Sequence, residues 1–341
     1  MKDLKYLAAY INPAFAVGGL LLGGWFTYMN VIFVFVLVPI FDQVGPESED
    51  NVEEHERLKL LKKSLFDWLL YLNLPLLYGI LILFIFTIDQ NSLATYELVG
   101  NILSVGIVIG TCGINVGHEL GHRKSKWENT IAQLLLIPAL YIHFFIEHNR
   151  GHHKYVGTEK DPASAEKGQG LYHFWIKSTF MGYLNAWKLE GKRLQKSGQS
   201  ALSFKNQMIR FTLVQFTYIL IIYMLVSPVA LVATLLAGVV GVLLLETINY
   251  LEHYGLRREK LQNGRYEKVH PRHSWNANFQ FGRIVLYELT RHSDHHFIAS
   301  KKYQVLDHHD SSPQLPFGYP MMILVALVPP LWFWIMDSRI Q

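Results

Sequence analysis

Histidines in four short clusters carry the chemistry that this sequence could perform. Nine of the 16 histidines fall in these clusters: His118, His122, His148, His152, His153, His253, His292, His295 and His296. Within a cluster they stand one to five residues apart, with the three- and four-residue spacings that place side chains on one side of a helix, so each cluster should aim several nitrogens the same way. Neutral imidazole is the commonest metal ligand among side chains. One metal cannot use nine rings, so the pattern predicts a site for two metals.

Dioxygen chemistry at iron suits such a site best. Nitrogen-rich iron sites leave coordination positions open for O2, and ligands that are nearly all neutral favour an oxidant able to attack an unactivated C–H bond. Spacing alone leaves zinc and copper open as the metal. The single cysteine, Cys112, excludes an iron–sulfur cluster built from this chain, and no Gly-x-Gly-x-x-Gly fingerprint is present. We therefore expect a separate protein to supply electrons.

Two other classes of protein compete with an oxygenase. The segment His118-Glu119-Leu120-Gly121-His122 also matches the zinc-protease pattern, which would make the chain an intramembrane metalloprotease. A single zinc would leave six of the clustered histidines unexplained. A metal-binding or transport protein is the third reading, but transporters build their sites at the bilayer midplane. Zinc content and peptide cleavage would distinguish the protease.

Hydropathy places the chain in a membrane. Half of its 341 residues are hydrophobic and only 17% are charged. A spanning helix needs about 20 mostly apolar residues. We predict an all-α integral membrane protein with one domain over 1–341. Two prolines interrupt the apolar run 321–336, which we interpret as a surface-lying or re-entrant helix and do not assign as a seventh span. The six predicted spans are 7–26, 31–41, 66–88, 98–116, 211–226 and 229–253.

The distribution of Lys and Arg predicts the orientation. The three connections expected on one side, 27–30, 89–97 and 227–228, contain neither residue type, whereas the other side receives all the basic segments. Cytoplasmic loops carry the positive excess. Both termini and the histidine clusters should therefore face the cytoplasm, with a histidine-rich, metal-binding cap formed by 117–210 and 254–341.

Longer ordered motifs resemble the signature segments of the membrane-bound alkane monooxygenases, the AlkB family. The resemblance runs in order from about Phe41 to Tyr319, through the segments 118–122, 147–153, 161–165, 249–256, 271–276, 289–296 and 313–320. Xylene monooxygenases are the nearest competitor, whereas fatty-acid hydroxylases and desaturases share only the general histidine pattern.

The resemblance implies a function. It implies six membrane helices in a bacterial inner membrane, a non-haem diiron site held by the nine histidines, and O2 as co-substrate. It further implies electrons from rubredoxin with rubredoxin reductase, and conversion of the terminal methyl group of a medium-chain linear alkane from the bilayer into a primary alcohol. The expected partners are thus rubredoxin and the lipid membrane, with no nucleic acid.

Polar residues beside the clusters are expected to support the ligands, because metal-bound histidines usually donate their other N–H to a carboxylate or carbonyl. An acid inside a span is costly without a partner, so we expect Glu246 to bond a ligand histidine or to lie near the metals, the alternative being an ion pair with Lys or Arg at the membrane edge. The residues expected around the ligands are Glu119, Glu147, Glu246, Asn249, Glu252, Asp294 and His273.

Two further features are interpreted as substrate and partner sites. Close helix packing is the simpler reading of the glycines in the fourth span, but they could also leave a narrow channel to the metals. These glycines are Gly106, Gly110, Gly113 and Gly117. The basic stretch 150–210 is typical of contact with anionic lipid and also suits docking of an acidic electron carrier. The expected docking residues are Arg150, Lys154, Lys188, Lys192 and Arg193.

Overall fold

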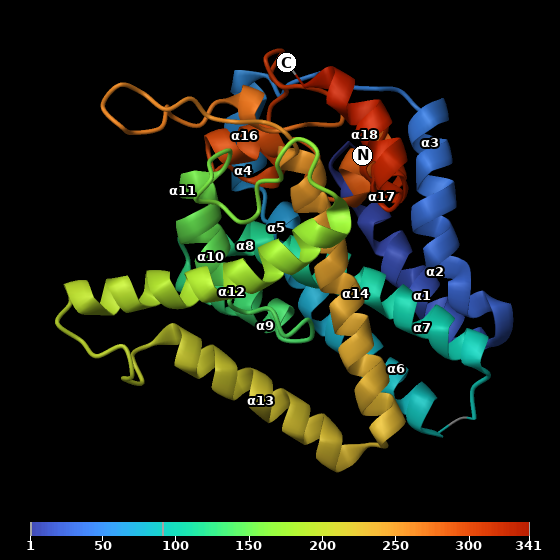
Figure 1. The fold of residues 1–341 in the computed structure, drawn as a ribbon. Helices are drawn as coiled ribbons and strands as arrows, with labels where there is room; N and C mark the ends of the chain where they lie inside the picture. Colours follow the sequence, from blue (N-terminus) through green and yellow to red (C-terminus); the bar gives the residue numbers. More distant parts are fainter. Residues whose placement is uncertain (1, 91, 341) are drawn as a thin grey trace.

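The computed structural model describes residues 2–90 and 92–340, whose regular secondary structure is almost entirely helical (Figure 1). Within these residues β-structure is limited to three isolated bridges, Glu47 with Phe279, Lys260 with Tyr266, and Asn276 with Gln314. The predicted all-helical class is confirmed.

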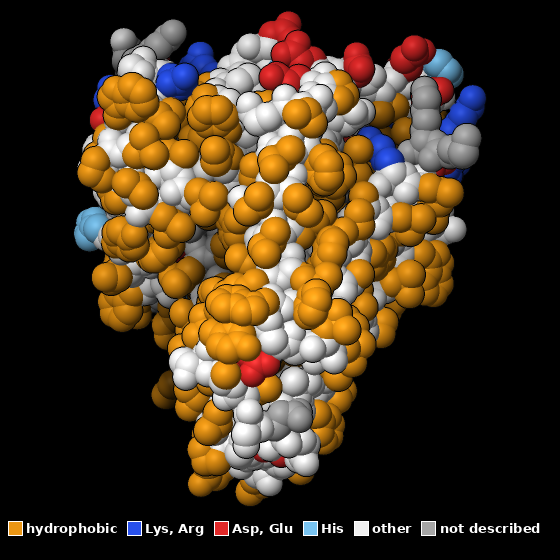
Figure 2. All heavy atoms as spheres, turned by 90° about the vertical axis from the view of Figure 1, so that its right-hand side faces the viewer, with side chains coloured by type: hydrophobic (Ala, Val, Ile, Leu, Met, Phe, Trp, Pro, Cys, Tyr) orange, Lys and Arg blue, Asp and Glu red, His pale blue; other side chains and the backbone are white. Residues whose placement is uncertain are grey.

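Five helices are long and apolar enough to cross a membrane, and five of the six predicted spans lie in them. They are Gly24–Val44, Leu65–Gln90, Thr95–Gly121, Gln207–Leu225 and Pro228–His253. Hydrophobic side chains cover most of the face shown in Figure 2, while most charged side chains gather along its upper edge. This distribution is typical of a bundle whose sides face lipid and whose cap faces water.

The first predicted span, 7–26, does not form one of these helices. The chain begins with the 3-10 helix η1 (Lys2–Tyr10) and continues as α1 (Ile11–Leu22), which is 12 residues long. Gly23 and Gly24 then adopt φ values of +65° and +57°, and the Gly24 N–H donates to Glu97 at 2.6 Å. Left-handed backbone ends a helix, so this apolar stretch turns directly into the next helix.

The long helices are built from successive segments with different hydrogen-bond registers. The segments are η2 (Gly24–Tyr28), α2 (Met29–Ile32), η3 (Phe33–Leu37), α3 (Val38–Val44), α5 (Leu65–Tyr71), α6 (Asn73–Gln90), α7 (Thr95–Val108), η4 (Ile109–Asn115), α8 (Val116–Gly121), α13 (Gln207–Leu225) and α14 (Pro228–His253). Two of them, η3 and η4, are π-helices. π-Helical turns shift which side chains face a neighbour and are frequent at functional sites.

Glycines bring α7 and α14 together. A Cβ on Gly106 would lie 2.5 Å from Val240, and one on Gly241 would lie 2.8 Å from Ile109. Such contacts require that neither position carries a side chain. The close crossing aligns α14 with the continuous helix Thr95–Gly121, of which α7 is the first part, so that His118 in α8 and His253 at the end of α14 emerge on the same side.

The remaining elements form the cap above the bundle, where α4, α11, α16 and α18 lie at one end in Figure 1. The apolar stretch 321–336 forms two short helices of eight residues each, too short to span a bilayer. The elements outside the long helices are α4 (Glu54–Lys62), α9 (Lys126–Leu136), α10 (Phe144–Glu147), η5 (His148–His152), α11 (His153–Tyr155), α12 (Leu171–Lys196), η6 (Pro271–His273), α15 (Gln280–Val285), α16 (His292–Phe297), η7 (Tyr303–Val305), α17 (Tyr319–Ala326), α18 (Pro329–Met336) and η8 (Asp337–Arg339).

Candidate metal centre

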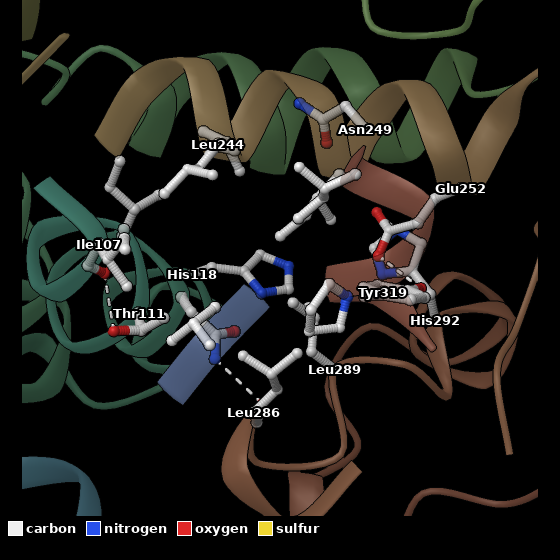
Figure 3. Close-up of a pocket in the computed structure, with 18 of the residues that line it drawn as sticks. Ile107, Thr111, His118, Leu244, Asn249, Glu252, Leu286, Leu289, His292 and Tyr319 are labelled. Carbon is white, nitrogen blue, oxygen red and sulfur yellow. Dashed lines mark hydrogen bonds and ion pairs between the residues drawn. The ribbon is translucent and has the colours of Figure 1, made fainter. Parts of the chain in front are cut away.

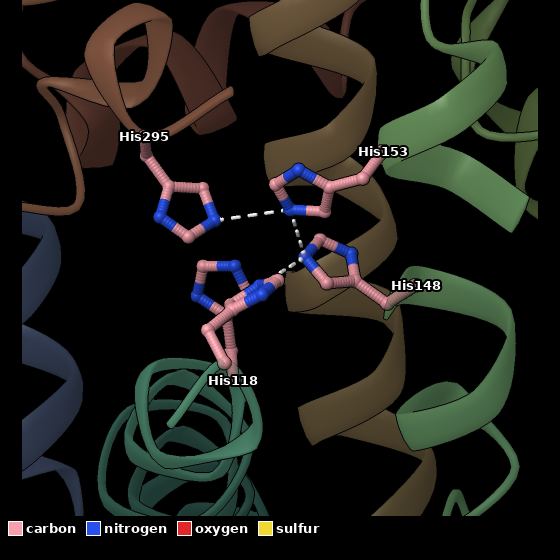
Figure 4. Close-up of side chains that lie close together, drawn as sticks. His118, His148, His153 and His295 are labelled. Carbon is pink, nitrogen blue, oxygen red and sulfur yellow. Dashed lines mark hydrogen bonds between the residues drawn. The ribbon is translucent and has the colours of Figure 1, made fainter. Parts of the chain in front are cut away.

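The structure brings all nine clustered histidines into two adjacent groups. In each group every ring offers one nitrogen, and these nitrogens lie within 4.8 Å of one another. Figure 4 shows rings of the first group converging from separate parts of the chain. The five-ring group contains His118, His122, His148, His153 and His295, and the four-ring group contains His152, His253, His292 and His296.

Two histidine-rich segments divide their rings between the groups. In η5, His148 belongs to the five-ring group and His152 to the four-ring group; in α16, His295 and His296 are separated in the same way. In each of these two histidine clusters, two rings therefore serve one group and the third serves the other. The reason is that η5 and α16 run between the two groups; the rings of His148 and His152 are stacked with their centroids 5.1 Å apart and still belong to different groups.

Distances between ring nitrogens suit metal ligation. The Nε2 atom of His148 lies 3.1 Å from that of His122 and 3.0 Å from that of His153. In the four-ring group, Nε2 of His152 and Nε2 of His296 are 3.2 Å apart. Nitrogens bound at about 2.1 Å and at right angles around one metal stand about 3.0 Å apart. One shared proton cannot satisfy an atom that faces two others, whereas a cation can.

The burial of the ring nitrogens also supports their assignment as metal ligands. Nε2 of His118 and Nε2 of His253 are buried without a hydrogen-bond partner, a costly arrangement that a metal would relieve. Among the rings outside the long helices, burial lowers the pKa well below the ordinary value, which keeps the imidazole in the neutral, metal-binding form. This holds for His122, His148, His153, His292, His295 and His296.

Two ligand rings have their second nitrogen fixed by a neighbour. Nδ1 of His152 lies 2.9 Å from the buried Asp161 carboxylate, and Nδ1 of His253 lies 3.3 Å from the backbone oxygen of His273. His273 thus contributes a carbonyl, while its own ring contacts Glu267. Asp161 was not among the residues expected around the ligands, although its segment is one of the motifs that carry the resemblance; it follows His152 by nine residues, across a turn.

Three of the expected carboxylates bind other groups. Glu119 accepts from Arg123 at 2.7 Å and from the Tyr303 N–H at 3.2 Å. Asp294 pairs with Lys301 at 2.6 Å. Glu147 accepts from the side-chain amide of Asn185 at 3.1 Å. These acids fix the segments that carry the ligands rather than contacting ligand rings.

Glu252 and Glu246 lie nearer the metals' expected positions. Glu252 is 3.0 Å from Nε2 of His292 and accepts from the Tyr319 hydroxyl at 2.9 Å. Glu246 accepts from the Tyr141 hydroxyl at 2.8 Å and lies 3.4 Å from the Asn249 amide. Glu246 also lines a small hollow with His148 and His152, and none of the ion pairs of the described residues joins it to Lys or Arg.

An apolar cavity reaches the histidines from within the bundle (Figure 3). His118 and His292 lie at its inner end with Asn249, Glu252 and Tyr319. Most of the wall is aliphatic or aromatic: Val34, Phe35, Ile107, Ile114, Phe144, Leu244, Leu245, Ile248, Leu286, Leu289 and Ile323. A pocket with this lining suits a small hydrophobic ligand.

Only one of the four glycines of the predicted channel, Gly110, lines this cavity. The other three pack against neighbouring chain. A Cβ on Gly106 would meet Val240 at 2.5 Å, one on Gly113 the Leu135 carbonyl at 3.1 Å, and one on Gly117 the Ala132 carbonyl at 3.2 Å. These three glycines therefore permit close packing instead of forming the channel wall.

The expected docking residues have different surroundings. Arg150 binds Glu190 at 2.9 Å and so joins η5 to α12, whereas Arg193 binds the same carboxylate at 2.6 Å from within α12. Lys188 and Lys192 are exposed on α12, and Lys154 is exposed beside His153. The five residues thus do not form a single free basic surface.

Comparison with known proteins places these features in a family. A family model described as fatty acid desaturase matches residues 97–325. Alkane 1-monooxygenase 2 of Pseudomonas aeruginosa is 40% identical over 318 residues, covering 92% of this chain and 84% of that protein. Alkane 1-monooxygenase 1 of Alcanivorax borkumensis is 36% identical and covers 100% of this chain and 85% of its own. The hydroxylase component of a Pseudomonas putida xylene/toluene monooxygenase is 27% identical, covering 98% and 87%.

Proposed function

This chain belongs to the alkane 1-monooxygenases of the fatty acid desaturase family, and from that premise we propose that it converts medium-chain linear alkanes into primary alcohols by hydroxylating a terminal methyl group. We propose that two non-haem irons occupy the two histidine groups, that O2 is the co-substrate, and that rubredoxin, reduced by rubredoxin reductase, supplies the electrons. The observation that carries the proposal is that an apolar cavity ends at rings of both histidine groups.

The cavity explains recognition of a molecule without polar groups. An alkane partitions into lipid, and each methylene buried in an apolar wall contributes about 0.8 kcal/mol. A second hollow, which shares Phe35, Ile107, Leu244 and Ile323 with the cavity, extends toward Trp175 and Leu327. We assign this hollow as the sideways route from the bilayer. The methyl end would then stop beside His118 and His292.

The residues at the inner end position the reacting groups and move protons. Bound iron would activate O2 for attack on the C–H bond. The overall reaction consumes the alkane, O2, two electrons and two protons and releases the alcohol and water. The Tyr319 hydroxyl holds the Glu252 carboxylate beside His292. Glu246 and Tyr141, in the polar hollow beside His148 and His152, are placed to pass protons toward the site.

The structure disfavours a zinc protease. In that reading Glu119 would act as general base on a metal-bound water. Its carboxylate instead accepts hydrogen bonds from Arg123 and the Tyr303 backbone, which hold it away from such a role. A single zinc would also leave one whole histidine group without use.

We further propose that the chain lies in the bacterial inner membrane with both termini and the cap on the cytoplasmic side. The basic segments support this orientation. The segment 2–22, formed by η1 and α1, would complete the six crossings that it requires, and both chain ends lie in the upper part of Figure 1.

One experiment tests the proposal. Purified protein should contain about two irons per chain, and with n-octane, O2, rubredoxin and rubredoxin reductase it should release 1-octanol. Replacing octane by xylene should give a much lower rate. Protein that binds two irons but hydroxylates only xylene or a fatty acid would contradict the proposed substrate, and zinc with peptide cleavage would contradict the reaction.

A further inference from the structure

A small hollow beside the five-ring group takes no part in the alkane route proposed above. Two rings of that group, His118 and His295, line it together with Tyr287, after which we name it the Tyr287 hollow. His118 also lines the apolar cavity, whereas His295 does not. The five-ring group can therefore be approached from two spaces.

Three residues separate the Tyr287 hollow from the apolar cavity. Asn115, His118 and Leu289 line both spaces. Figure 3 shows two of them, His118 and Leu289, at the wall of the cavity. The Asn115 amide is fixed because it donates to the Leu286 backbone oxygen at 3.0 Å. An alkane that fills the cavity as far as His118 would therefore leave the Tyr287 hollow free.

An unusual turn of the backbone forms part of this partition. Tyr287 and Glu288 have φ values of +53° and +59°, in the left-handed region that side chains rarely adopt. Arg283 holds the Glu288 carboxylate at 2.8 Å, and the Tyr287 hydroxyl donates to the Leu69 backbone oxygen at 3.2 Å. The turn places Tyr287 in the wall of the hollow and Leu289 in the wall of both spaces. Strained backbone of this kind clusters at functional sites.

The lining of the Tyr287 hollow suits a small guest without polar groups. Leu70, Val116 and Leu306 line it, and all three are buried. Its carboxylate, that of Glu119, accepts a hydrogen bond at 2.7 Å from Arg123, which does not line the hollow. A buried water molecule needs about two to four polar partners, whereas a diatomic gas needs only apolar contact.

We propose that the Tyr287 hollow receives O2 while an alkane occupies the apolar cavity. The inference rests on the proposed function and gives its two substrates separate approaches. O2 is apolar and partitions into hydrocarbon, so it can arrive through the bundle, where Leu70 belongs to the membrane-spanning helix Leu65–Gln90. Two spaces that meet at His118 allow both substrates to be present together, whereas in a single space the alkane would compete with O2.

Xenon, which enters dry apolar cavities, tests the gas site without turnover. Crystals of the full, iron-loaded chain under xenon pressure should show anomalous scattering from xenon in the Tyr287 hollow, and n-octane should not displace it. The signal should disappear in Leu306→Phe, because the larger ring fills the hollow. The matched control is Leu315→Phe, at an equally buried residue that lines neither space, and it should keep the signal. Xenon confined to the apolar cavity, or ordered water in the hollow in place of xenon, would overturn the proposal.

Steady-state kinetics test the same site in the working enzyme. Leu306→Phe should raise the KM for O2 about fivefold and keep the KM for n-octane within about twofold, because the ring removes space from O2 alone. Gly110→Val, which adds a side chain to the apolar cavity, should show the reverse pattern. Val116→Ile adds one methylene to another wall of the hollow, with less risk to folding, and should raise the KM for O2 by a smaller factor.

The outcomes separate this inference from the function on which it rests. An unchanged KM for O2 in the folded Leu306→Phe and Val116→Ile proteins, or an equal rise in both KM values, would overturn the O2 site. Xenon bound in the hollow of a wild-type protein that forms no alcohol from n-octane would instead contradict the proposed function.

Discussion

At the scale of single residues, the contact between His152 and Asp161 fixes how one ring faces its metal. Both side chains are buried, and the Ser164 hydroxyl also donates to Asp161. Burial would lower the pKa of His152, but the charge of Asp161 and the hydrogen bond to it prevail and raise it. The carboxylate therefore holds a proton on Nδ1 and leaves Nε2 free for a metal.

Asp161→Asn should weaken iron binding by about 10- to 100-fold, because an amide holds the imidazole N–H less strongly than a carboxylate. Competition with a chelator, followed by metal analysis, measures the change. Glu159→Gln, which alters an exposed acid two residues earlier, is the matched control and should bind iron like the wild type. Equal retention of iron in both variants would show that Asp161 does not support the ligand.

Glu246→Ala should lower the rate of alcohol formation at least about tenfold, as expected for loss of a proton-transferring group. Glu246→Gln, which preserves the volume but cannot carry a proton, should lose a similar amount, while both variants keep their iron. Steady-state turnover and iron analysis on the same samples provide the test. Full activity in either variant would remove Glu246 from the proton path.

Sequence spacing predicted which histidines come together, because nine histidines at helical spacing in so apolar a chain are hard to account for without metals. It predicted their neighbours less well. Acids adjacent in sequence to a ligand, such as Glu119 and Asp294, point toward Arg123 and Lys301. The acid that contacts His152 is nine residues away, and only the fold of the intervening turn brings it there.

At the scale of elements, the crossing of α7 with α14 shapes the cavity. Gly110 has room for a side chain, since its nearest neighbours would lie 3.6 Å from an added Cβ, whereas Gly106 has none. The two positions are only one helical turn apart, so substitutions at Gly110 and at Gly106 distinguish an effect on the channel from an effect on helix packing.

Gly110→Val should shift the preferred alkane to one shorter by about three carbons, because the added side chain places three carbon atoms in the cavity region. Gly106→Val should instead destabilise the protein by about 1–3 kcal/mol without changing relative rates among alkanes. Product profiles from a mixture of alkanes, together with melting temperatures, distinguish the two. An unchanged profile in a well-folded Gly110 variant would contradict the channel.

Glu190 joins three elements and predicts a pH-dependent stability. Despite burial, hydrogen bonds from Arg193, the Gln207 backbone and Arg150 lower the pKa of Glu190 to about 2. A lowered pKa stabilises the fold above the ordinary value of 4.5, and that stabilisation is lost as pH falls from 4.5 toward 2.

Glu190→Gln should therefore destabilise the protein at neutral pH by roughly 3 kcal/mol, which a lower melting temperature would reveal. The difference from wild type should shrink as the pH falls below 4.5. Exposed Glu166, changed to Gln, serves as the control and should melt like the wild type at every pH. A difference that stays constant across this range would show that the Glu190 charge is not the cause.

Hydropathy located five helices of the bundle but not the end of the first helix. An apolar window over 7–26 contains no signal that Gly23 and Gly24 will take left-handed conformations, because that depends on Glu97, which lies far along the chain. The two π-helical segments of the bundle, η3 and η4, could likewise not be predicted from a hydrophobic period of 3.6 residues, because that period assumes one hydrogen-bond register along the whole helix.

At the scale of the whole molecule, the cap joins both halves of the chain over one end of the bundle. Reporter fusions should therefore show both termini on the cytoplasmic side, whereas a reporter inserted between Val226 and Pro228 should lie on the opposite side. Activity of an alkaline phosphatase fusion, which folds only outside the cytoplasm, measures this. An active phosphatase at the carboxyl end would contradict six crossings.

Motif order anticipated which segments meet in the cap, but not how they are arranged. The rings of η5 and α16 alternate between groups because these elements run between the two sites, a relation that follows from assembly of distant segments. Local spacing contains no information about this alternation.

The polar residues at one end of the otherwise apolar cavity have a consequence for the release of the product. In the proposed reaction a hydrocarbon tail would meet the same aliphatic wall before and after hydroxylation, but the hydroxyl of the alcohol would lie beside Asn249, Glu252 and Tyr319, which line the cavity. The product would thus form polar contacts that the substrate lacks, and each further methylene would add about 0.8 kcal/mol to its binding free energy. Turnover of the longest accepted chains should therefore be limited by the rate at which the alcohol dissociates.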